Sequence, residues 1–268
     1  TNWILETAKT CQDPTWYAEA LLEAAQLRIE EGQQGVAEEY LKLAENIFVK
    51  LNSPVGAARA LTILGKALIQ HGAHDLATVT LERSLFITRE NSDRLGEASA
   101  LLQIGILHMR QKRYVQTRPY LDEAQGIFEL AGHLPGKMFC LFSRGELYYE
   151  ERRIDMALVA LEEALEIAQT LSSPQWEASI LGLMGAVSLL LKDLSTARTK
   201  LERAEAIIEE LNTPHRFAFI LAYRGELDRL TGESTKAWHS LDEAAVKSGL
   251  FGTIPTTAVS QAVHRLHG

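Results

Sequence analysis

The stretch LTILGKALIQHGAHDLATVTLERS at residues 61–84 recurs 40 residues later as LLQIGILHMRQKRYVQTRPYLDEA at residues 101–124. Each stretch begins with leucine, carries glycine four positions later and has a second leucine 20 positions after the first. Both leucine columns persist through six consecutive units, as Leu21, Leu61, Leu101, Leu141, Leu181 and Leu221, and as Leu41, Leu81, Leu121, Leu161, Leu201 and Leu241. A regular period of this length is typical of repeat proteins.

Small residues recur between the leucines. The first small column is Ala25, Gly65, Gly105, Gly145, Gly185 and Gly225, and a later one is Ala37, Ala77, Thr117, Ala157, Ala197 and Ala237. A further small column follows the second leucine, as Ala44, Ser84, Ala124, Ala164, Ala204 and Ala244. Glycine inside a helix costs about 1 kcal/mol relative to alanine. We therefore expect the glycine column to permit close contact between the two helices of a unit, with the paired leucines filling the space around it.

Within a unit the apolar spacing is helical, as at Leu61, Leu64 and Leu68, and each unit holds two helices. Breaks between paired helices are predicted at residues 32–35, 72–75, 112–113, 152–153, 192–193 and 232–234, where glycine supplies the left-handed residue that helix ends favour. Prolines at 54, 174 and 214 separate successive units, because proline cannot continue a helix.

The sequence therefore predicts an all-α fold, an α-α superhelix in which antiparallel helix pairs form one solenoid over residues 1–268. The expected repeats span about residues 18–54, 55–94, 95–134, 135–174, 175–214 and 215–254. Residues 1–17 are expected to be the tail helix of a preceding half-repeat, so we expect the chain to be one piece of a longer protein. Residues 255–268 are expected to form a terminal capping helix.

Composition argues against several classes of function. The formal net charge of -8 argues against binding to nucleic acids and to acidic membranes, because phosphate neutralisation needs clustered cations. No apolar run reaches the roughly 18 residues of a membrane helix. Cys11 and Cys140 provide neither a disulfide framework nor metal-ligand spacing. Phosphate-binding loops and catalytic motifs are absent from the sequence. We expect a cytoplasmic protein without enzyme activity, metal or cofactor.

The column order Leu61, Gly65, Gly72, Ala77, Leu81 and Ser84 resembles the tetratricopeptide repeat, and the other units follow it over nearly the whole chain. The usual period of that repeat is about 34 residues, and these units are about six residues longer. Longer units of this kind look like those of kinesin light chains, of polarity scaffold proteins that bind heterotrimeric G-protein subunits, and of the helical sensor region of bacterial maltose-activator-type regulators. The resemblance implies a concave surface, lined chiefly by the first helix of each unit, that binds extended or helical peptides.

Carried over unit by unit, the concave positions of that family give the expected partner-binding residues. They are Arg59, Lys66, Gln103, Met109, Phe139, Phe142, Glu146, Tyr149, Phe219, Tyr223 and Glu226. Phe139, Phe142 and Tyr149 either form an anchor pocket for apolar side chains or pack between adjacent first helices. The paired Lys and Asn residues with which some relatives clamp a terminal carboxylate are not reproduced, so binding of an acidic C-terminal tail is not expected.

Two sets of cationic residues stand out in this acidic chain. The first is a basic stretch of Arg110, Lys112, Arg113 and Arg118, which either receives an acidic peptide or a phosphate or forms a solvated turn between helices. The second is Arg144 and Arg224, each of which precedes a column glycine in an Arg-Gly-Glu-Leu tetrapeptide. Each of these two arginines either pairs with a nearby carboxylate while its stem packs on the next unit, or marks a recognition face.

We expect a protein–protein interaction scaffold that binds a peptide or helix of a partner protein in its concave groove. The alternative is a ligand-sensing or self-association segment of a larger signalling or transcriptional regulator. An ordered partner along the helix that carries Phe139 and Tyr149 would favour the scaffold, and a nucleotide-binding or DNA-binding region in the parent chain would favour the regulator.

Overall fold

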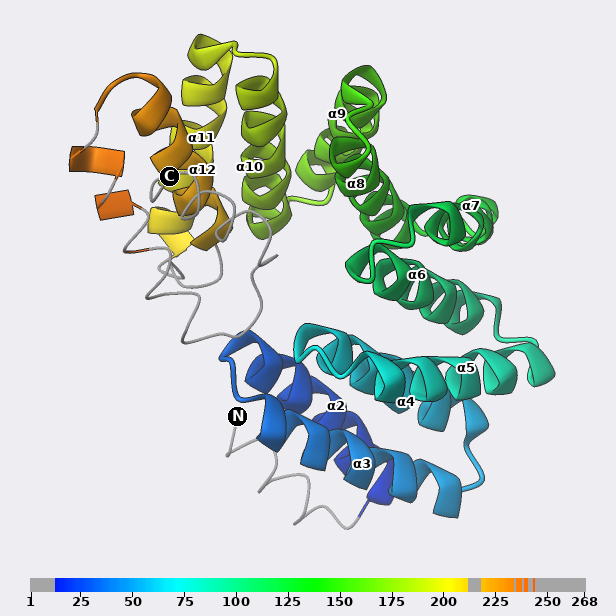
Figure 1. Ribbon diagram of the computed structural model, residues 1–268. Helices are drawn as coiled ribbons and strands as arrows, with labels where there is room; N and C mark the ends of the chain where they lie inside the picture. Colours follow the sequence, from blue (N-terminus) through cyan, green and yellow to red (C-terminus); the bar gives the residue numbers. More distant parts are fainter. Residues whose placement is uncertain (1–12, 212–217, 234, 238, 241–242, 244–268) are drawn as a thin grey trace. The chain divides into compact units, whose positions relative to one another are not determined.

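The computed structural model describes residues 13–211, 218–233, 235–237, 239–240 and 243. Every regular element in these ranges is an α-helix (Figure 1), so the all-α prediction is confirmed. The helices are α2 (Pro14–Glu30), α3 (Gln34–Lys50), α4 (Pro54–Gln70), α5 (His74–Glu90), α6 (Arg94–Arg110), α7 (Tyr114–Leu130), α8 (Leu134–Glu150), α9 (Ile154–Thr170), α10 (Pro174–Leu190), α11 (Leu194–Leu211) and α12 (Ala218–Leu230). Among the described residues, no helix is long and apolar enough to cross a membrane.

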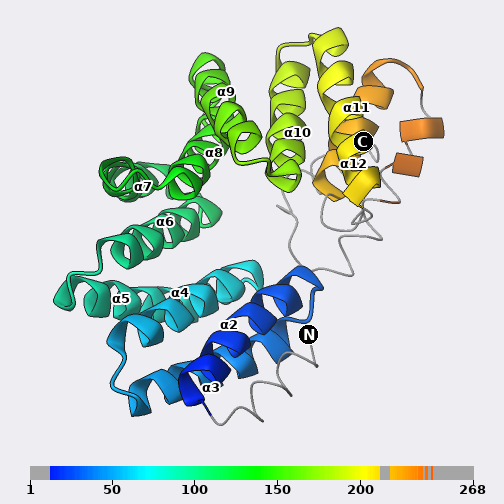
Figure 2. The same ribbon diagram turned by 180° about the vertical axis from the view of Figure 1, so that it is seen from behind.

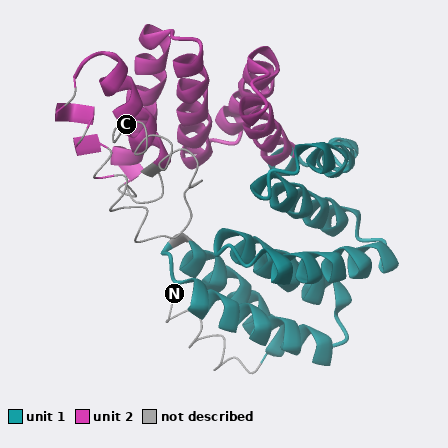
Figure 3. Cartoon of the chain, viewed as in Figure 1, with its two compact units in different colours: residues 1–136 teal, residues 137–268 magenta. Residues whose placement is uncertain are grey.

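The chain divides into two compact units, Thr1–Gly136 and Lys137–Gly268, which Figure 3 colours separately. The first unit contains α2 to α7, and the second contains most of α8 together with α9 to α12. The prediction of one solenoid with six repeats stays a prediction. Residues 1–12 and 255–268, for which a tail helix and a capping helix were predicted, lie outside the described residues.

Consecutive helices pack against one another within each unit (Figures 1 and 2). In the first unit α2 packs on α3, α4 on α5 and α6 on α7, while α3 also contacts α4 and α5 contacts α6. In the second unit α10 contacts α9, α11 and α12. Each helix pair therefore buries its apolar stripe against its neighbours, as in helical repeat proteins.

The glycine column lies where the sequence predicts close contact. A Cβ atom added at Gly185 would lie 2.8 Å from both Cγ and Cδ2 of Leu201, on the second helix of the same pair. Gly65, Gly105 and Gly145 face Leu81, Leu121 and Leu161 in the same way. Because the column leucines are fully buried, the facing leucine or its helix would have to shift to admit a side chain in place of these glycines. The predicted role of the glycine column is confirmed.

A left-handed residue occurs in the described turns every 20 residues. Glycine supplies it at Gly32, Gly72, Gly132 and Gly232, with φ between 65° and 82°. Residues with side chains supply it at Asn52, Ser92, Lys112, Arg152, Ser172 and Lys192, with φ between 50° and 60°. The helix resumes soon after each turn, so Gln34 and Gly35, which were predicted to lie in a break, belong to α3. Tertiary packing therefore imposes the same turn whether or not glycine is present.

A second contact between a large and a small residue joins one helix pair to the next. Phe48 of α3 lies against Gly56 of α4, and Phe128 of α7 lies against Gly136 at the start of α8. Both rings are almost completely buried. A large side chain at the end of a second helix is thus matched by a glycine in the first turn of the following helix.

Candidate functional site

Six aromatic side chains gather on the first helices of the second unit, and we call this set the aromatic face. Its members are Phe139, Phe142 and Tyr149 of α8, Trp176 of α10, and Phe219 and Tyr223 of α12. All six are half-buried, so each ring packs against the core and keeps part of its surface in contact with solvent. Five of them pack around a core cluster that includes Met138, Leu141 and Ile180.

Trp176 is the centre of one half of the aromatic face. Its ring centroid lies 4.6 Å from that of Phe139 at an interplanar angle of 53°. The ring of Phe142 meets it edge-on, at 5.5 Å and 74°. These are favourable tilted and edge-to-face geometries, which fix the three rings relative to one another.

Tyr223 is the centre of the other half. Its ring meets Phe219 edge-on at 6.2 Å, and its side chain is hydrogen-bonded to Tyr149. Burial raises the pKa of Tyr223 well above its ordinary value, and Tyr149 and the negative charges of Glu146 and Glu150 raise it further. The Tyr223 hydroxyl therefore stays neutral in ordinary buffers.

Gly182 of α10 allows α12 to come close to α10. A Cβ atom added there would lie 2.6 Å from Cγ1 of Ile220 and 3.1 Å from Cε2 of Phe219. A side chain at this position would displace α12 and the two aromatic residues that it carries. The aromatic face thus depends on a glycine as well as on its rings.

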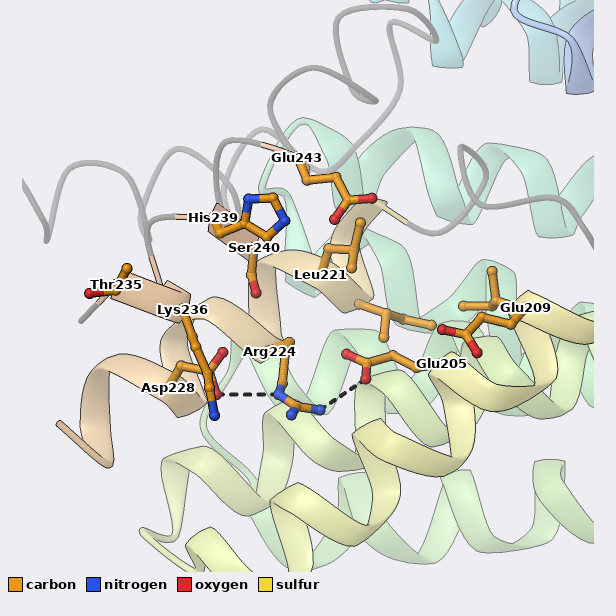
Figure 4. A pocket seen from close by; sticks show the side chains of 12 residues that line it. Glu205, Glu209, Leu221, Arg224, Asp228, Thr235, Lys236, His239, Ser240 and Glu243 are labelled. Carbon is orange, nitrogen blue, oxygen red and sulfur yellow. Dashed lines mark hydrogen bonds and ion pairs between the residues drawn. The ribbon is translucent and has the colours of Figure 1, made fainter. Parts of the chain in front are cut away.

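The second unit also contains a pocket of about 460 Å³ between α11, α12 and the described residues that follow α12 (Figure 4). Arg224 projects into it between two carboxylates, at 2.9 Å from Glu205 and 3.3 Å from Asp228. Burial raises the pKa of Glu205, while the positive charge of Arg224 opposes that rise. The pocket is thus crossed by an internal ion-pair network, which explains Arg224 as a structural residue. Of the two alternatives raised by the sequence, the local pairing with carboxylates is confirmed for Arg224.

Arg144, the counterpart of Arg224, has a different partner. It donates a hydrogen bond to the Tyr148 hydroxyl at 3.1 Å, and its guanidinium carbon lies 5.9 Å from the Tyr148 ring centroid. Arg153 lies over the same ring at 5.1 Å. Arg144 thus packs on the next turn of its own helix, α8.

Comparison with known proteins agrees with this architecture. A family model of the tetratricopeptide repeat matches residues 96–170. The match covers α6 to α9, so these helices are tetratricopeptide repeats. Among curated proteins, no sequence matches the chain.

Several solved tetratricopeptide-type structures share the fold. BtubC (BKLC) from P. vanneervenii is 19% identical with a TM-score of 0.61, over 87% of this chain and 91% of that one. A Rap protein complexed with Competence and Sporulation Factor is 17% identical with a TM-score of 0.71, over 90% of this chain and 66% of that one. The Rap conjugation gene regulator of plasmid pLS20, in complex with a Phr peptide, is 16% identical with a TM-score of 0.71, over 89% and 66%. At these identities the likeness is one of fold.

The partner-binding positions predicted in the second unit lie together in the structure. Phe139, Phe142, Tyr149, Phe219 and Tyr223 are five of the six members of the aromatic face. The acidic members Glu146 and Glu226 are half-buried beside them in α8 and α12, and both oxygens of Glu226 accept hydrogen bonds from Arg229 at 2.9 Å. A binding role for these residues stays a prediction.

The positions predicted in the first unit are less uniform. Arg59 forms an exposed ion pair with Glu19 at 2.7 Å, linking α4 to α2. Lys66 is exposed on α4 and Gln103 is half-buried on α6. Met109 is only 6% exposed, because its side chain packs in the core, so it offers a partner almost no surface.

The predicted basic stretch lies at the turn between α6 and α7. Arg110 ends α6, Lys112 is the left-handed turn residue and Arg113 precedes α7, while Arg118 is half-buried in α7. The neighbouring His108 ring stacks on Tyr120 at 5.3 Å, and its pKa is lowered first by burial and then by Arg113. Three of these four cations thus occupy an interhelix turn. No described group of three or more His, Cys, Asp or Glu residues could hold a metal ion.

Trp176 was not among the predicted residues, although the repeat contains a signal for it. Position 176 is aligned with Gly56, Gly96 and Gly136, in the first turn of the helix that begins the next pair. We call the contact between one helix pair and the next a step. The facing position on the preceding helix is Ala168, where other pairs carry Phe48 or Phe128. Large and small residues have exchanged places, and Trp176 packs on the cluster that contains Ala168. Compensating volumes at the two aligned positions predict this contact.

Proposed function

We propose that this protein is an interaction scaffold whose aromatic face binds a peptide or helix of a partner protein. The observation that carries the proposal is the gathering of six half-buried rings from three first helices on one unit. Rings held by mutual contacts lose little conformational entropy on binding and offer a large apolar contact area. They are suited to anchoring apolar side chains of a partner.

Proteins with this fold support the proposal. The similar Rap structures were solved with Competence and Sporulation Factor and with a Phr peptide. The second of them is a conjugation gene regulator, which also favours the alternative that this chain is the sensing segment of a larger regulator. Both roles need a face that holds a peptide or protein ligand. We propose no catalytic role for the described residues.

The test is affinity capture from cells of the source organism with three forms of the protein. The first is the wild type, and the second carries Phe142→Ala and Tyr149→Ala. The third carries Met156→Ala and Val159→Ala, which remove apolar surface that is 40% and 67% exposed on α9. Circular dichroism confirms that all three remain helical. We expect the aromatic-face variant alone to lose a captured protein, and equal capture by all three forms would refute the proposal.

Contact is then mapped directly. With the photo-crosslinker p-benzoylphenylalanine in place of Phe142, we expect covalent capture of the same protein. With the crosslinker at Val159, on the exposed side of α9, we expect none. Crosslinking at Val159 alone would move the interaction to the second helices.

A further inference from the structure

The carboxylates beside the aromatic face define which peptide it would accept. Glu146 and Glu150 lie one helical turn apart on α8, so their side chains project from the same side of that helix. Glu146 follows Phe142 by four residues and precedes Tyr149 by three, so the two carboxylates lie on the face of α8 that carries these rings. Negative charge therefore adjoins the exposed surfaces of the rings.

The cations of the same helices are engaged with partners within the protein. Lys137 of α8 lies 2.6 Å from Glu163, and Arg144 is hydrogen-bonded to Tyr148. Arg224 and Arg229 of α12 pair with carboxylates on α11 and α12. The described length of α10 contains no Lys or Arg. The three helices thus place acidic groups on the face that carries the rings, and three of their four cations are paired with carboxylates.

Rings bordered by carboxylates recognise a particular chemistry. An ammonium or guanidinium group is attracted to the face of a Trp, Tyr or Phe ring within about 6 Å, and the aliphatic stem of Lys or Arg packs on the same ring. A neighbouring carboxylate adds an ion pair, and the net charge of -8 attracts cations over longer distances. An acidic ligand would instead meet like charge.

We propose that the aromatic face recognises a basic peptide segment in which Arg or Lys stands next to apolar residues, with Glu146 and Glu150 as its specificity-determining residues. This inference rests on the proposed function and adds the sign of the charge on the ligand. It separates the aromatic face from the basic stretch at the turn between α6 and α7, whose cations would suit the opposite ligand.

The test uses two pools of short fluorescent peptides that are identical except at their charged positions. Both pools carry Leu and Phe anchors, and one has Arg or Lys where the other has Asp or Glu. Fluorescence anisotropy gives the affinity of each pool. We expect the basic pool to bind at least about tenfold more tightly, and that affinity to fall as salt is raised.

Two charge-matched variants locate the effect. Glu146→Gln with Glu150→Gln should lower affinity for the basic pool about tenfold. The control is Glu162→Gln with Glu166→Gln, which makes the same charge change at the same spacing on exposed positions of α9 and should leave affinity within about twofold. An equal loss in both variants would reduce the effect to net charge and overturn the assignment of specificity.

The remaining outcomes separate the inference from the proposed function. If the acidic pool binds as tightly and is lost in the Phe142→Ala, Tyr149→Ala variant, the face binds peptides but the inferred charge is wrong. If neither pool binds the wild type, the inferred ligand is wrong, while loss of capture by the Phe142→Ala, Tyr149→Ala variant would still support the proposed function. If the measured affinity for the basic pool falls as the total protein concentration is raised, a second copy of the chain competes with the peptide for the face. The inference is then overturned.

Discussion

The contact between Gly185 and Leu201 permits a quantitative test of the packing that builds each helix pair. Gly185 lies in the interior of α10, and a methyl group there would approach two Leu201 side-chain atoms to 2.8 Å. Leu201 is fully buried. The perturbation is a double-mutant cycle of Gly185→Ala and Leu201→Ala.

The expected free energies follow from the geometry. Leu201→Ala removes buried apolar groups and leaves a cavity, which costs about 2–5 kcal/mol. Gly185→Ala gains about 1 kcal/mol in helix propensity but loses about 1–3 kcal/mol through overpacking, so alone it should be neutral to destabilising by about 2 kcal/mol. In the Leu201→Ala background the clash is absent, and the same substitution should stabilise by about 1 kcal/mol. The coupling energy is then about 1–3 kcal/mol.

Urea unfolding followed by circular dichroism measures the four free energies of the cycle. Gly126→Ala is the control, because Gly126 lies inside α7 and an added Cβ meets nothing within 4 Å. It should stabilise by about 1 kcal/mol in any background. If Gly185→Ala has the same effect with Leu201 as with Ala at position 201, the two residues are not coupled and the explanation of the glycine column is wrong.

Four further predictions address turns, ion pairs and the step between helix pairs. Lys192→Gly relieves a left-handed φ of 60° and should stabilise the protein by about 1 kcal/mol. Lys42→Gly, in the middle of α3, should destabilise it by about 1 kcal/mol. If urea unfolding gives both substitutions a change in free energy of the same sign, the turn assignment is wrong. Arg224→Ala leaves two largely buried carboxylates without their cation and should lower the free energy of unfolding by about 2–4 kcal/mol. Arg59→Ala, at an exposed ion pair, should lower it by less than about 1 kcal/mol. Equal losses of stability in urea unfolding would argue against the internal network. Hydrogen bonds from Thr196 and Ser195 lower the pKa of Asp193 to about 2. Its stabilising contribution is therefore present above its ordinary pKa of 3.8 and is lost as the pH falls to about 2. The difference in urea midpoint between the wild type and Asp193→Asn should shrink over that interval, and a constant difference would contradict this prediction. Ala168→Phe alone should destabilise the protein by about 1–3 kcal/mol through overpacking. Adding Trp176→Gly should restore most of the lost stability, measured by thermal unfolding. Additive losses of stability would show that the two positions are independent.

The helical pairs were predictable because their contacts repeat. A column such as Ala37, Ala77 and Ala157 is fully buried in every described unit. The same steric constraint therefore selects a small residue at the same position of each repeat. The left-handed residues at Lys112 and Lys192 were less predictable, since their conformation is imposed by the packing of the helices on either side and not by a local preference.

The candidate site was only partly predictable, for the opposite reason. Positions that face away from the helix-pair contact carry no common constraint, and the column that contains Phe142 also holds Leu22, Thr62, Leu102, Gly182 and Ala222. Resemblance to a family indicated five of the six members of the aromatic face, on α8 and α12. It also included Met109, which the core covers, and it did not include Trp176, which stands at a position where three other units have glycine.

Trp176 shows how the repeat can place an aromatic ring on the surface while the contact between helix pairs stays filled. A step between helix pairs needs one large and one small side chain, and either helix can provide the large one. Where the second helix provides it, as Phe48 and Phe128 do, the ring is buried within the step. Where the first helix provides it, as Trp176 does, the ring also reaches Phe139 and Phe142 and remains half-exposed. With Ala at position 168 and Trp at position 176, the contact between the helix pairs stays filled while an aromatic ring reaches the surface, and the leucine and small-residue columns are the same as in the other units.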